Sequence, residues 1–105
     1  MATFIMGMNY HGERPNFEQN LDDRNEEVMR LLQATGGKLV SFYRTQGRFD
    51  VIAVLEMPDA ETMQAFNIAN QDSHWTIETM RAFGLEEYPA IWEKARKLLK
   101  DADIR

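Results

Sequence analysis

The stretch GGKLVSFYRTQGRFDVIAVLE, residues 36–56, contains two short apolar runs separated by a polar break at Gln46-Gly47. Runs of this length that are rich in β-branched and aromatic residues and flank a glycine are typical of the two strands of a hairpin. Neither run alternates cleanly, because apolar side chains occur at both odd and even positions. A sheet covered on one side needs only one apolar face. The pattern therefore indicates a sheet that is covered on both faces.

The rest of the chain supplies the other elements of a small α+β domain. The predicted elements are a strand over 2–10, a helix over 17–35, the two hairpin strands, a helix starting at Pro58-Asp59, a strand over 75–83 and a helix from about Pro89 to Lys100. The order β-α-β-β-α-β followed by a helix is that of the ferredoxin-like fold. We expect residues 1–84 to form this domain and residues 85–105 to be a helical extension of it.

In this fold, right-handed crossovers place the first two helices on one face of a four-stranded antiparallel sheet. The other face is left bare, although each strand carries apolar side chains in both directions. Leaving such a face in water costs about 25 cal/mol per Å² of apolar surface. The last helix can cover part of it, but a second copy of the sheet covers it more completely. The sequence predicts a face-to-face homodimer whose interface includes either Ile52 and Val54 or Val51 and Ala53.

The C-terminal segment is predicted to be an amphipathic helix. Its apolar residues share one face and are Tyr88, Ile91, Trp92, Ala95, Leu98 and Leu99. A lone helix with such a stripe is not expected to stay exposed to water, because short helices derive most of their stability from packing. We therefore expect this helix to dock against another surface.

Composition and charge exclude several classes of function. With 105 residues and a net charge of −5 the chain has the size of one domain and no basic surplus for binding phosphates, so nucleic acid is not an expected partner. The absence of cysteine excludes disulfides, zinc–thiolate sites, iron–sulfur clusters and cysteine nucleophiles. The sequence shows neither a membrane span of about 20 apolar residues nor a signal-peptide pattern. These features predict a cytoplasmic protein with no membrane partner.

Four motifs resemble the GYD domain family: GGK at 36–38, SFY at 41–43, GRFD at 47–50 and TMRAF at 79–83. The resemblance spans roughly residues 2–84 and implies a dimeric α/β barrel. Phe49 stands where the family usually has tyrosine, so the hydroxyl is missing here. Related dimeric α/β barrels include cofactor-independent monooxygenases, muconolactone-isomerase-like enzymes, haem-degrading enzymes and amino-acid-sensing modules. The fold does not choose among these functions.

The predicted topology brings chemistry-bearing residues to one end of the sheet. The end of the first strand lies beside the start of the fourth, and the hairpin turns at the same end. His11 and His74 are the predicted catalytic acid and base, because imidazole titrates near neutral pH, and Asp50 could orient one of them. The predicted substrate-binding residues are Asn9, Tyr43, Arg44, Arg48 and Trp75, with the arginines suited to a carboxylate or enolate oxygen.

Each of these residues also has a simpler structural explanation. Asp50 can accept backbone N–H groups after a turn, the arginines can form surface ion pairs, and the aromatic residues can serve packing. Two histidines and a carboxylate could bind a divalent metal, but an HxH or HxxxH spacing is lacking. We therefore predict no metal and no other cofactor.

The leading functional hypothesis is a homodimer that binds, and could transform by acid–base chemistry, a small carboxylate or aromatic metabolite. The reaction would be of the isomerase type or of the cofactor-independent monooxygenase type. One alternative is a non-catalytic metabolite-sensing module, which would be stabilised by a ligand without turnover. The other is a structural subunit of a larger homo-oligomeric assembly, which would have no pocket of ligand size.

Overall fold

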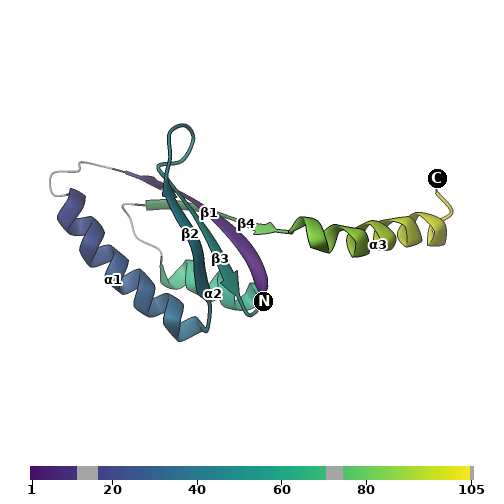
Figure 1. Cartoon of the computed structure of the whole chain (residues 1–105), viewed down its shortest axis with the longest axis horizontal. Helices are drawn as coiled ribbons and strands as arrows, with labels where there is room; N and C mark the ends of the chain where they lie inside the picture. The colour runs from purple at the N-terminus through teal and green to yellow at the C-terminus, as the bar shows by residue number, and fades with distance from the viewer. Residues whose placement is uncertain (12–16, 71–74, 105) are drawn as a thin grey trace.

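A computed structural model describes residues 1–11, 17–70 and 75–104, of which 17–25 are described by their backbone. Its elements are β1 (Ala2–Tyr10), α1 (Phe17–Thr35), β2 (Lys38–Arg44), β3 (Val51–Met57), α2 (Ala60–Ala69), β4 (Trp75–Ala82), the 3-10 helix η1 (Leu85–Glu87) and α3 (Tyr88–Asp101). The strands form one antiparallel sheet in the order β2-β3-β1-β4. The α+β, ferredoxin-like fold predicted from the sequence is confirmed (Figure 1).

The core lies between the sheet and the helices α1 and α2. Strand alternation places Val51, Ala53, Leu55 and Met57 of β3 on this helix-covered face, where all four are buried. The remaining buried apolar residues are Phe4 and Met6 of β1, Leu32 of α1, and Met63 and Phe66 of α2. Burying a side chain of this size contributes about 1.5–3 kcal/mol, so this layer supplies most of the apolar stabilisation.

The opposite face of the sheet carries no helix of its own. We call it the helix-free face and define it by Ile5, Tyr43, Ile52, Val54 and Met80, which the strand register places on the same side. Ile52 and Val54 are half-buried, whereas Tyr43 and Met80 are exposed. Of the two sets that the sequence allowed for this face, the structure selects Ile52 and Val54.

Local signals in the sequence set the helix ends. α1 stops at Thr35, whose hydroxyl donates to the Leu32 carbonyl at 2.6 Å, and Gly36 follows with φ +75°, a conformation that favours glycine. α2 is capped by Asp59, which accepts from the backbone N–H of Thr62 at 2.7 Å.

Helical spacing in the sequence predicts that the inward stripe of α2 consists of Ala60, Met63, Phe66 or Asn67, and Asn70. Met63, Phe66 and Asn70 are buried, but Ala60 is exposed, so this residue was wrongly assigned to the core. At about 100° per residue, Ala60 falls at the edge of the stripe that the other three define.

α3 extends away from the domain instead of packing on it. In Figure 1 the sheet separates α1 from α3, and the chain measures 59 × 30 × 22 Å along its principal axes. None of the residues of α3 is buried. The helix does not pack on its own domain, so its docking against another surface stays a prediction. Among the described residues, no helix is long and apolar enough to cross a membrane.

Candidate functional site

Hydrogen bonds join the loop between β2 and β3 to the end of β1. Together these two segments form the polar end of the sheet. The backbone N–H of Asp50 donates to the Met8 carbonyl at 3.0 Å and to Asn9 Oδ1 at 2.9 Å. In return, Tyr10 N–H donates to Asp50 Oδ2 and Asn9 Nδ2 donates to the Arg48 carbonyl, both at 2.9 Å. Side chains of Asn9 and Asp50 therefore satisfy backbone groups of the facing segment, which fixes the loop on the strand.

Phe49 packs its ring over Gly7 on the helix-free face. A Cβ atom at Gly7 would lie 2.6 Å from the Phe49 ring, so glycine is the residue that permits this close approach. The Arg48 guanidinium lies 5.4 Å from the centre of the same ring and pairs with Glu78 of β4 at 3.1 Å. The GRFD motif thus closes part of the helix-free face and links β1, the loop and β4.

Histidine and aromatic candidates occupy the adjacent strand ends. His11 follows β1, is exposed, and its Nε2 shares a hydrogen bond with the Thr76 hydroxyl of β4. Tyr10 and Trp75 meet edge to face, with ring centres 5.3 Å apart. His74 lies outside the described residues.

The remaining candidates lie at the end of β2. Tyr43 pairs with Ile52 on the helix-free face and is 59% exposed, and Arg44 pairs with Val51 and is exposed. The structure therefore brings Asn9, Arg48 and Asp50 into one bonded group. The catalytic and substrate-binding roles of the candidates stay predictions.

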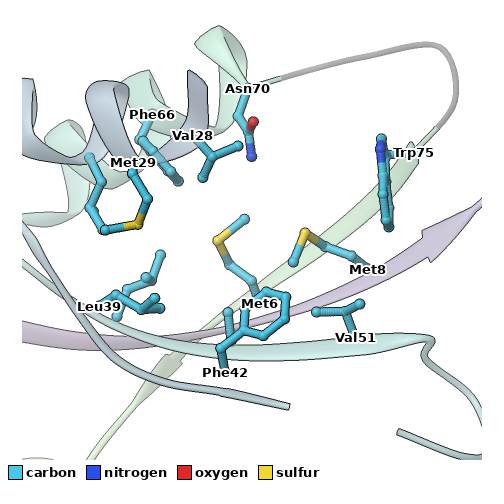
Figure 2. A pocket seen from close by; sticks show the side chains of 13 residues that line it. Met6, Met8, Val28, Met29, Leu39, Phe42, Val51, Phe66, Asn70 and Trp75 are labelled. Atoms are coloured by element: carbon cyan, nitrogen blue, oxygen red, sulfur yellow. The ribbon is translucent and has the colours of Figure 1, made fainter. Parts of the chain in front are cut away.

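A cavity of about 350 Å³ lies between the sheet, α1 and α2. We call it the core cavity; Figure 2 shows Met6, Met8, Met29, Phe42, Asn70 and Trp75 around it. The amide of Asn70, which is buried at the end of α2, points toward the cavity, and the Trp75 ring forms one side. Of the lining residues that the structure describes, none is charged.

Sequence reasoning missed the core cavity because most of its wall consists of ordinary buried or half-buried apolar residues. Of the described candidates, Trp75 lines it, on the helix-covered side of the sheet. The one signal that could have pointed to it is the methionine content of β1 and α1, because methionine fills irregular spaces and adapts to ligands.

The histidine and acidic side chains of the described residues do not form a metal site. Among residues 1–11, 17–70 and 75–104, no three His, Asp or Glu side chains come together in a way that could hold a metal ion. Backbone hydrogen bonding from Thr62, and then the bond from its side chain, holds the pKa of Asp59 below the ordinary value of 3.8. That group caps α2 just after β3, away from the polar end of the sheet.

These features define the class of the protein: a ferredoxin-like α+β domain with one helix-covered and one helix-free sheet face. The sequence pattern of the GYD domain family matches residues 4–92, and the chain belongs to this family. The match extends past residue 84, where the resemblance was expected to end, into the first turns of α3. A comparison with curated proteins gave no match.

Proposed function

We propose that this protein binds a small, largely apolar molecule in the core cavity. The observation that carries the proposal is a space of about 350 Å³ between the sheet and two helices, whose described lining residues carry no charge. Small-molecule sites typically measure about 300–1,000 Å³ and combine apolar walls with a few polar groups. The volume is at the lower end of this range, which suits a single aromatic ring system or a short aliphatic metabolite.

The lining favours an aromatic ligand over a carboxylate. Burying a charged group without a charged partner or several hydrogen bonds is costly, and no charge lines the described wall. Asn70 and the indole of Trp75 are the polar groups of that wall.

The geometry also supports binding over catalysis. Asp50 and Asn9 hold the hairpin loop on β1 through hydrogen bonds to backbone groups. This arrangement supports an anchoring role for Asp50 in place of the orienting role predicted for it. We therefore favour the non-catalytic metabolite-binding module among the alternatives, and the acid–base role of His11 and His74 stays a prediction.

We also propose that the binding protein is a homodimer joined through the helix-free face. Tyr43 and Met80 on this face are 59% and 48% exposed. Phe49 packs over Gly7 on this face, and the exposed Tyr43 and Met80 are left to contact a partner. A second copy of the same face matches it in chemistry.

Thermal unfolding with added aromatic compounds tests the binding proposal. Indole and phenol are suitable probes, with benzoate as the charged counterpart. A ligand at about ten times its dissociation constant adds about 1.4 kcal/mol, which raises the melting temperature of a domain of this size by several degrees. We expect this rise with indole or phenol and a smaller one with benzoate.

A matched pair of variants tests whether the cavity is the site. Val28→Phe adds a ring to the cavity wall on α1, whereas Ala34→Phe adds one to the exposed side of the same helix. We expect Val28→Phe to abolish the indole-induced rise and Ala34→Phe to retain it. Equal responses of the two variants, or no rise in the wild type with any probe, would contradict the proposal.

A further inference from the structure

α3 presents a wide apolar stripe that its own chain does not cover. Trp92 is 58% exposed, Leu98 69% and Tyr88 43%, and no residue of the helix is buried. The opposite side is basic in character, with Lys97 and Lys100 beside Glu93. Since a helix of 14 residues is marginally stable in water without packing, this stripe requires a partner surface.

Side-chain contacts at the junction between β4 and α3 fix the direction in which the helix leaves the domain. Gly84 N–H donates to the carboxylate of Glu87 at 2.8 Å, and the same carboxylate group pairs with Arg81 at 3.6 Å. The Arg81 guanidinium in turn lies 4.3 Å from the ring centre of Phe83 and 5.7 Å from that of Phe4. These contacts direct α3 away from its own sheet, so its own domain does not cover the stripe.

We infer that α3 of each protomer packs on the partner subunit, so that the two copies exchange their C-terminal helices across the helix-free faces. The inference rests on the homodimer proposed above and adds the helix to its interface. In Figure 1, α3 extends on the side of the sheet away from α1, and a second copy seated on the helix-free face would lie on that side as well. A twofold axis then gives each helix the same contact on the other copy.

The exposed aromatic residues supply part of the area that a stable dimer needs. An aromatic side chain buries about 150–250 Å² when fully covered. Three half-exposed aromatic residues of the two surfaces therefore leave about 300 Å² per chain, or about 600 Å² in two copies. These residues are Tyr43, Tyr88 and Trp92. This is over a third of a standard interface of about 1,600 Å², before the aliphatic residues of α3 are counted.

Charge and symmetry favour a second copy over other occupants. α3 carries Arg96 and three lysines against two acidic residues, whereas the whole chain has a net charge of −5, so the helix and the remaining domain are complementary. A lipid surface could also take a basic amphipathic helix, but it would leave the helix-free face in water. Exchange between two copies covers both apolar surfaces at once.

Sedimentation of matched α3 variants of the full chain tests the exchange. Trp92→Glu and Leu98→Glu place a charge in the stripe, and Lys97→Glu places the same charge on the opposite side. We expect the wild type to sediment at twice the 12.2 kDa chain mass. Each stripe variant should raise the dimer dissociation constant by at least about tenfold, since it buries a charge, and the control by less than about twofold.

The outcomes separate this inference from the proposal on which it rests. If the wild type is a dimer and none of the three variants changes its dissociation constant, the helix exchange is wrong and the proposed homodimer stands. A wild-type monomer would overturn both. A monomeric wild type could instead cosediment with vesicles of phosphatidylcholine and phosphatidylglycerol. If Trp92→Glu abolishes this binding and Lys97→Glu does not, the helix exchange is wrong and lipid is the partner of the stripe.

Discussion

The contact between Gly7 and Phe49 shows how single residues determine the local structure. An added Cβ at Gly7 would approach the Phe49 ring to 2.6 Å, closer than real Cβ atoms come to neighbouring atoms. We predict that Gly7→Ala lowers the free energy of unfolding by about 1–3 kcal/mol, as overpacking does. Urea denaturation measures this value. In a Phe49→Leu background, Gly7→Ala should lower the free energy of unfolding by less. An equal loss there would show that the Phe49 ring does not cause the destabilisation.

The N-cap of α2 gives a pH-dependent prediction at the same scale. The folded-state pKa of Asp59 lies below its ordinary value of 3.8, so the ionised cap stabilises the folded state above that pH. The stabilisation is lost as the pH falls through the folded-state pKa. We predict that Asp59→Ala lowers the melting temperature at pH 7 and that the difference from the wild type shrinks below about pH 4. Melting curves across pH measure this, and a difference that does not depend on pH would contradict it.

At this scale the sequence was a partial guide to the candidate site. Strand order alone placed Asn9, Arg48 and Asp50 at one end of the sheet, and the structure joins them. The hydrogen bonds of Asp50 and the packing of Phe49 on Gly7 depend on the path of the loop between β2 and β3. Apolar periodicity in the sequence does not determine that path. The core cavity could not be found because apolar side chains that line a space look the same in sequence as those that fill one.

At the scale of elements, apolar periodicity and capping residues predicted each strand and α-helix in the right order. Gly36 after α1 and the N-cap Asp59 before α2 are local signals, and both lie at the helix bounds that the sequence predicts. Periodicity also identified the apolar face of α3. It could not say which surface covers that face, because the direction of the helix depends on the contacts of Glu87 and Arg81 at the junction.

Truncation of the chain after Glu87 tests the role of α3 as an element. This cut keeps η1 and the junction contacts and removes a helix that has no buried residue. We predict that the wild-type melting temperature rises with protein concentration, as expected for a dimer, and that the truncated protein loses most of this dependence. At low concentration the two should melt together. A large loss of stability there would show that α3 supports its own domain.

In the part of the chain that the structure describes, apolar side chains are exposed on the helix-free face and on the stripe of α3. A charge on the helix-free face should therefore disrupt the assembly. We predict that Met80→Lys shifts the mass measured by light scattering from twice the 12.2 kDa chain mass toward that of one chain. Ile68→Lys is the matched control, because Ile68 is also exposed but lies on α2. Equal masses for the two variants would place the interface elsewhere.

The central claim, that a small apolar molecule occupies the core cavity, is tested most directly by NMR of methionine methyl groups. Met6, Met8 and Met29 line the cavity, whereas Met1 and Met80 are exposed elsewhere. On titration with indole, we predict saturable shifts of the three lining methyl signals, caused by the aromatic ring, and unchanged signals for the two exposed residues. Shifts confined to Met1 or Met80, or no saturable shift at any methionine, would contradict the claim.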